Sequence, residues 1–72
     1  MMIYDVFGRH IGVQRDNERW RVYRVDLTEG KHSSLDGVVI PDFITEAEIP
    51  GWLDDIYHEA ATASHPEVKR IR

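Results

Sequence analysis

The sequence contains no cysteine among its 72 residues. Disulfide bonds are therefore excluded, and so is catalysis by a thiol nucleophile. A domain of this length buries only about 60% of the surface that its unfolded chain exposes. One small core must then supply the stability without covalent support. The lack of cysteine also fits a reducing compartment.

Long apolar runs are missing as well. No run approaches the roughly 18 residues of a membrane span, and the first segment, MMIYDVFGR, lacks the basic and apolar regions of a signal peptide. Hydrophobic residues make up 42% of the chain, which is typical of a globular domain and not of a disordered one. We expect a single small domain over residues 1–72, located in the cytoplasm and without a membrane partner.

The motifs of common enzyme classes are also scarce. Ser33 and Ser34 lie in a polar stretch without the glycine-framed elbow of a serine hydrolase. The segment VFGRHIG does not have the spacing of a dinucleotide fingerprint, and no phosphate-binding loop is present. A domain this small offers little concavity in which to shield a reaction. The sequence therefore predicts a protein that is not an enzyme and uses no cofactor.

The formal net charge of −4 is unevenly distributed. Residues 1–25 carry a net charge of +2, residues 26–62 carry −8, and residues 63–72 carry +2. The acidic total argues against general nucleic-acid binding, which depends on neutralising phosphates. Attraction between the basic and acidic parts within one fold explains the pattern more simply.

Apolar β-formers alternate with polar residues over the first third of the chain, which predicts an antiparallel meander. Gly8-Arg9 and Asp16-Asn17 fit two-residue hairpin turns, because Gly, Asp and Asn tolerate the backbone angles of such turns. A polar loop is expected over residues 28–36. The expected strands span about residues 2–7, 10–15, 18–26 and 37–40.

The two predicted turns agree on which side chains share a face of the sheet, because a slip by one residue would exchange the faces. They would pair Tyr4 with Val13 and Ile11 with Val22. The expected core face holds Tyr4, Val6, Ile11, Val13, Trp20 and Val22. The expected opposite face holds Asp5, Phe7, His10, Gly12, Gln14, Arg19, Arg21 and Tyr23. Gly12 either marks a bulge or leaves room for Asp5 and Arg21 to pair across it.

The segment TEAEIPGWLDDIYHEAAT predicts an amphipathic helix over about residues 45–62. Thr45 followed by Glu48 fits a capping box, in which two side chains satisfy free backbone N–H groups. Pro50 would interrupt a helix that began at Thr45. Either a first turn kinks into the main helix, or the main helix begins at Pro50. We favour a short turn followed by one continuous helix.

The predicted fold is α+β, a three- or four-stranded antiparallel meander with one long amphipathic helix packed on one face. The tail over residues 63–72 either adds a short edge strand through Val68 and Ile71 or stays loose. The sheet residues expected in the core are Ile11, Val13, Trp20 and Val22, and their expected helix partners are Trp52, Leu53, Ile56 and Ala60.

Asp54, Asp55 and His58 share the polar side of the predicted helix, because residues three and four apart are neighbours there. A histidine with carboxylates suits a divalent metal. Ligands from a single turn make a weak candidate site without another residue from elsewhere, and acidic residues and histidine are ordinary on a solvated helix face. We expect no metal.

A single helix covers one side of the sheet and leaves the other side bare. Phe7, His10 and Tyr23 are expected there in one row, flanked by Arg19 and Arg21. Aromatic residues and Arg are enriched in protein interfaces, although a solvated face with cross-strand pairs is the alternative. We predict a binding module that contacts another protein, or a second copy as a homodimer, through this face. The other function considered is single-stranded nucleic-acid binding, with Phe7 and Tyr23 stacking on bases and the two arginines on phosphates.

The segments VFGR, WRVY, VVIP and WLDDIYHEA, in this order, resemble a group of short, uncharacterised bacterial single-domain proteins with a domain of unknown function. The resemblance spans nearly the whole chain and transfers no site residue. Three strands followed by TEAEI and a helix are also similar in architecture to the N-terminal half of HicB-type antitoxins. The glycine-rich first hairpin motif and the C-terminal DNA-binding segment of those proteins are not evident in this sequence.

Overall fold

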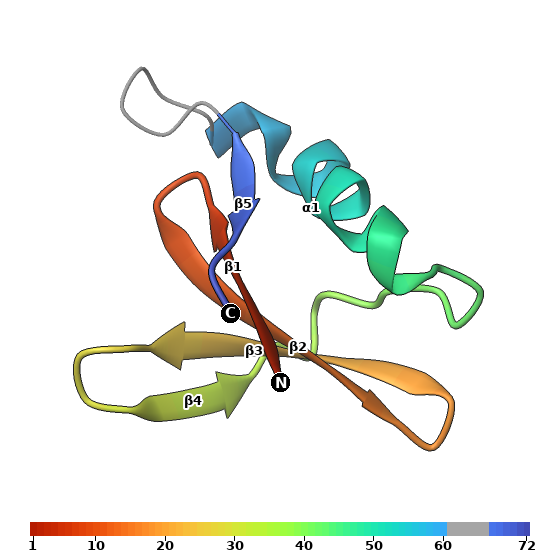
Figure 1. Cartoon of the computed structure of the whole chain (residues 1–72), viewed down its shortest axis with the longest axis horizontal. Helices are drawn as coiled ribbons and strands as arrows, with labels where there is room; N and C mark the ends of the chain where they lie inside the picture. The colour runs from red at the N-terminus through yellow and green to blue at the C-terminus, as the bar shows by residue number, and fades with distance from the viewer. Residues whose placement is uncertain (61–66) are drawn as a thin grey trace.

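The computed structural model describes residues 1–60 and 67–72, which form a five-stranded antiparallel sheet with one short helix on one face (Figure 1). The α+β class is as predicted. The sheet order is β4-β3-β2-β1-β5. The strands are β1 (Met2–Val6), β2 (Arg9–Asp16), β3 (Arg19–Asp26), β4 (Lys31–Ser34) and β5 (Val68–Arg70). In this described part of the chain, no helix is long and apolar enough to cross a membrane.

Both hairpin turns differ from the predicted ones by one residue. Their central residues are Phe7 and Gly8 in the first hairpin and Asn17 and Glu18 in the second. All four have positive φ, between 50° and 91°, which is the pattern of type I′ turns. Tyr4 consequently pairs with Ile11 and not with Val13, so each predicted register is wrong by two residues. A shift by two leaves every strand side chain on its predicted face.

The shift of the first turn changes the predicted environment of Phe7. It was predicted on the open face, but it lies in the turn, where strand alternation does not apply. Its side chain is only 6% exposed and belongs to the hydrophobic core. The prediction of Phe7 as a surface residue is therefore wrong.

The fourth strand lies earlier in the chain than predicted. Residues 37–40 form no strand, and β4 instead comes from the segment predicted as a loop. The Asp26 carboxylate accepts hydrogen bonds from the backbone N–H groups of Thr28, at 2.9 Å, and Glu29, at 3.2 Å. Gly30 has φ 71°. These features close a hairpin between β3 and β4. All four residues of β4 are exposed and polar or charged, so no apolar alternation marked it.

The edge strand considered for the tail is present. β5 pairs antiparallel with β1, with Tyr4 opposite Arg70. The Arg70 guanidinium also contacts the Glu46 carboxylate at 2.9 Å, which ties β5 to the segment before the helix. Burial raises the pKa of the Tyr4 phenol, and the nearby Arg70 opposes that rise.

The helical region has three parts, a 3-10 turn (Glu46–Glu48), α1 (Ile49–Tyr57) and a second 3-10 turn (His58–Ala60). The predicted capping box is present, because the backbone N–H and the hydroxyl of Thr45 both donate to Glu48 Oε1, at 3.0 and 2.8 Å. Pro50 lies in the first turn of α1, where its missing N–H is tolerated. The short turn before the main helix is confirmed, but α1 has only 9 residues and is not the long helix predicted. The predicted end at residue 62 lies outside the described residues.

The core lies between α1 and the covered face of the sheet. Its buried side chains are Tyr4, Val6, Phe7, Ile11, Val13, Val22, Ile40, Ile49 and Leu53. Trp20 is half-buried at its margin and donates its Nε1–H to the Ile44 carbonyl at 2.8 Å. Ile56, predicted in the core, is 46% exposed, because α1 turns Ile49 and Leu53 toward the sheet instead. The packing predicted for Ala60 lies outside the described side chains.

We expect Leu53→Ala to lower the free energy of unfolding by about 2–5 kcal/mol, because its side chain is 0% exposed and truncation would leave a cavity. Ile56→Ala is the matched control on the same helix, and we expect it to cost about 1 kcal/mol or less because half of that side chain is already in water. Chemical denaturation followed by tryptophan fluorescence measures both. Equal losses would show that α1 packs through a different side.

The pKa of Glu48 is lowered, chiefly by the backbone N–H of Thr45 and also by its hydroxyl. The ionised carboxylate therefore stabilises the folded state above the ordinary value of 4.5, and this contribution disappears as the pH falls through the lowered pKa. We expect Glu48→Gln to melt below the wild type at pH 7, with a difference that shrinks in strongly acid solution. Thermal melts of both proteins across pH measure it. A difference that grew toward low pH would contradict this role of the carboxylate.

Candidate functional site

The sheet face opposite α1 carries four of the five predicted binding residues. His10 and Tyr23 are half-buried there, and Arg19 and Arg21 are exposed. Phe7 is absent from this face because it lies in the core. The row of three aromatic rings predicted for this surface is therefore reduced to two, and its role in binding stays a prediction.

Two of these residues have partners within the sheet. Arg21 Nε donates to Asp16 Oδ2 at 2.7 Å, across the β2–β3 hairpin. The Tyr23 ring packs edge-to-face against His32 of β4, with 5.1 Å between the ring centroids. The contact of His32 with Tyr23 was not predicted from the sequence, because the residues of β4 were assigned to a loop. These contacts reduce what Arg21 and Tyr23 offer to a ligand.

Gly12 lies at the centre of the same face and pairs regularly with Ile3 and Tyr23, without a bulge. A Cβ at this position would collide with the Met1 side chain and lie 2.8 Å from Val25 Cγ2. The space above Gly12 is thus occupied by those two side chains. Neither alternative considered for Gly12 is found, because the strand has no bulge there and Arg21 pairs with Asp16 and not with Asp5.

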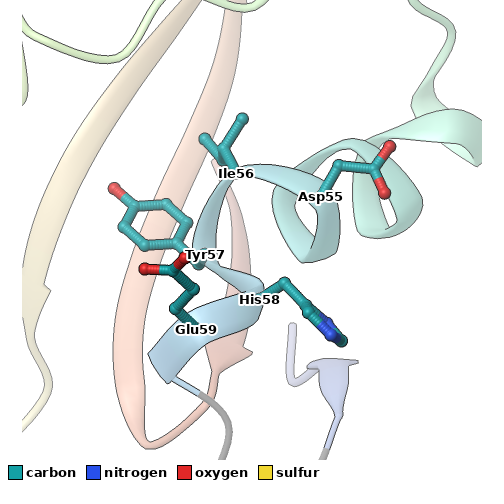
Figure 2. A pocket seen from close by; sticks show the side chains of 5 residues that line it. All are labelled: Asp55, Ile56, Tyr57, His58 and Glu59. Atoms are coloured by element: carbon teal, nitrogen blue, oxygen red, sulfur yellow. The ribbon is translucent and has the colours of Figure 1, made fainter.

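The polar side of the helix brings together only part of the weak metal candidate. His58 Nδ1 lies 3.3 Å from Asp54 Oδ1; the His58 side chain is largely exposed and that of Asp54 is half-buried. Asp55 and His58 extend in different directions from the helix (Figure 2). Across residues 1–60 and 67–72, no three His, Asp or Glu side chains are grouped so that they could hold a metal ion.

An apolar hollow, which we call the helix–loop groove, lies between α1 and the loop after β4. It has a volume of about 470 Å³ and is lined by Gly37, Val38, Val39, Trp52, Ile56 and Tyr57. Ile40, at 1% exposed, anchors the loop in the core. Val39 and Ile56 nevertheless remain 72% and 46% exposed. Large aliphatic side chains therefore surround the hollow and face the solvent.

A second hollow, which we call the arginine pocket, lies on the other side of Tyr57. It has a volume of about 260 Å³ and is lined by Arg9, His10, Ile11, Arg24, Val25, Leu35 and Tyr57. Tyr57 is packed against the core, and its ring extends from the end of α1 over the strands (Figure 2). The N–H of Leu35 donates to the Val22 carbonyl at 2.9 Å, which holds Leu35 beside β3. Four separate segments thus meet at this pocket.

Neither hollow was predicted from the sequence. Arg9 was assigned to a turn, and residues 37–39 were assigned to a strand. The one sequence signal was that Val38 and Val39 are adjacent, in a segment without period-two alternation. Both hollows depend on where α1 ends, which the apolar periodicity did not reveal.

Comparison with known proteins gave one match. A search of curated proteins and a search of solved structures found nothing similar to this chain. A family model described as "Domain of unknown function (DUF7661)" matches residues 1–72, which agrees with the expected resemblance to small domains of unknown function. That description names no activity, so the geometry above has to support any function. The chain belongs to the DUF7661 family, since the family model covers its whole length.

Proposed function

We propose that this chain is a binding module that acts by protein–protein contact and not an enzyme. The observation that supports this proposal is the exposed apolar surface around the helix–loop groove. Val39 is 72% exposed and Ile56 is 46% exposed, next to the half-buried rings of Trp52 and Tyr57. A contiguous apolar surface around a hollow is typical of interaction sites. Full burial of one such side chain by a partner contributes roughly 1.5–3 kcal/mol.

The groove is a better candidate than the open sheet face. Phe7 lies in the core, Arg21 is paired with Asp16, and the ring of Tyr23 packs on His32. What remains on the open face for a partner is His10, Arg19 and the exposed edges of the paired side chains. We keep the open face as the second candidate surface, through which two copies of the chain would form a homodimer.

The occupant proposed for the groove is an apolar segment of another protein that also carries negative charge. The charge follows from what lies beyond Tyr57, where Arg9 and Arg24 line the neighbouring pocket. A partner with a carboxylate next to its apolar side chains would be complementary to both hollows at once. An apolar partner segment without negative charge would contact only the groove.

Binding of single-stranded nucleic acid loses much of its support. Its mechanism needs successive aromatic platforms, and the burial of Phe7 leaves Tyr23 alone. We therefore do not favour it. The proposed module would act in the cytoplasm, as the lack of cysteine suggests. A bacterial origin and a likeness to HicB-type antitoxins stay predictions from the sequence.

We expect the double variant Val39→Ser, Ile56→Ser to lose its protein partner, with the dissociation constant raised about tenfold or more, because two apolar contacts are removed. Arg21→Ser, Tyr23→Ser is the matched control on the open face and should bind like the wild type. Thermal melting first checks that both fold. A photo-crosslinking residue at position 39 identifies the partner in living cells, and titration calorimetry then compares the variants.

Two results would contradict the proposal. If the open-face variant lost the partner and the groove variant kept it, the contact would lie on the other side of the sheet. If sedimentation showed a dimer that only the open-face variant disrupted, the partner would be a second copy of the chain on that face.

A further inference from the structure

The arginine pocket has an unusual balance of charge for this chain. The protein has a net charge of −4, yet the described residues that line the pocket include two arginines and no Asp or Glu. Arg9 begins β2 and Arg24 lies in β3. The helix α1 contacts β1 and β5, whereas the β3–β4 hairpin extends away from it (Figure 1).

The two pocket arginines have no side-chain partner among the residues that the structure describes. Three other arginines have partners. Arg15 donates to the Asp42 carbonyl, Arg21 contacts Asp16, and Arg70 contacts Glu46. Within residues 1–60 and 67–72, neither Arg9 nor Arg24 makes a side-chain hydrogen bond or an ion pair. A guanidinium carries five N–H donors. Among the described residues, no side chain or carbonyl uses the donors of these two arginines.

Apart from His10, the rest of the lining is mainly apolar. Ile11 is 3% exposed and belongs to the core, and Leu35 and Tyr57 pack against the same core. An anion such as inorganic phosphate would satisfy the arginines but would leave this apolar surface without a contact. A carboxylate accepts paired hydrogen bonds from arginine, and an aliphatic group attached to it would cover the apolar residues.

We propose that the arginine pocket binds a carboxylate carried by an aliphatic group. Arg9 and Arg24 hold the carboxylate, and Ile11, Leu35 and Tyr57 contact the aliphatic part. The identity of the natural ligand rests on the proposed function, because Tyr57 joins the pocket to the helix–loop groove and makes the carboxyl-terminal residue of the bound partner the expected source. The binding of the carboxylate itself stands on the pocket alone.

The test is an NMR titration of the ¹⁵N-labelled protein with four small molecules. N-acetyl-leucine represents a peptide carboxyl terminus, hexanoate represents a free aliphatic acid, N-acetyl-leucinamide is the neutral control, and inorganic phosphate is the control without an aliphatic group. We expect both acids to shift the amide signals of Leu35 and Tyr57 with saturation, and both controls to bind more weakly. Tighter binding of N-acetyl-leucine would support a peptide source, and tighter binding of hexanoate a free acid.

Substitutions connect the binding to the pocket. We expect Arg9→Gln and Arg24→Gln each to raise the dissociation constant for N-acetyl-leucine about tenfold, because each removes a charge-assisted contact. Arg19→Gln makes the same change of charge outside the pocket and should bind like the wild type. Thermal melting checks that all three variants fold.

Three outcomes would overturn the proposal. The first is that neither acid binds with saturation, and the second is that N-acetyl-leucine and its amide bind equally well. The third is that the double variant Arg9→Gln, Arg24→Gln binds N-acetyl-leucine as tightly as the wild type. If phosphate bound as tightly as the acids, the proposal that the ligand carries an aliphatic group would be wrong. The groove variant Val39→Ser, Ile56→Ser separates the two proposals, because it should still bind the acids even if no protein partner uses the groove.

Discussion

The packing of a short helix on one side of the sheet determines most of what this domain exposes. Ile49 and Leu53 are fully buried and are the contacts by which α1 covers the apolar face. With only 9 residues, α1 covers the half of the sheet near β1 and β5. Tyr57 marks the end of that cover. The helix–loop groove and the arginine pocket both open there, on its two sides, so they follow from the length of the helix.

The faces of the sheet were predictable, whereas the turns were not. Alternation with period two survives any even shift, so Tyr4 and Ile11 share the covered face although their pairing differs from the predicted one. The turn position depended on whether Gly8 is the first or the second central residue. Placing Phe7 at φ 52° is unusual for a bulky residue, and propensity alone argued against it. Its burial in the core accompanies that backbone conformation.

The candidate sites were harder to predict than the fold because they join segments distant in the sequence. Asp54 and His58 are neighbours on one helix, and their contact follows from spacing alone. The arginine pocket joins Arg9, Arg24 and Tyr57, whose proximity depends on the register of β2 with β3 and on the end of α1. Leu35, the residue after the polar strand β4, also lines the pocket. In the sequence, β4 is marked by the turn residues Asp26 and Gly30 and not by apolar alternation. Local patterns identify the residue types but not their meeting point.

β5 extends the sheet by pairing with β1, with Tyr4 opposite Arg70. Among the strands that the structure describes, this pairing has the greatest separation along the chain. Loop closure of that size is entropically unfavourable before the contacts form, and non-local pairing slows folding. Before this pairing forms, the backbone groups along the outer edge of β1 are without strand partners. An open strand edge is a template for intermolecular pairing. Once β5 has paired, this outer edge of the sheet consists of three residues that include Lys69 and Arg70, and a short, charged edge strand resists intermolecular pairing.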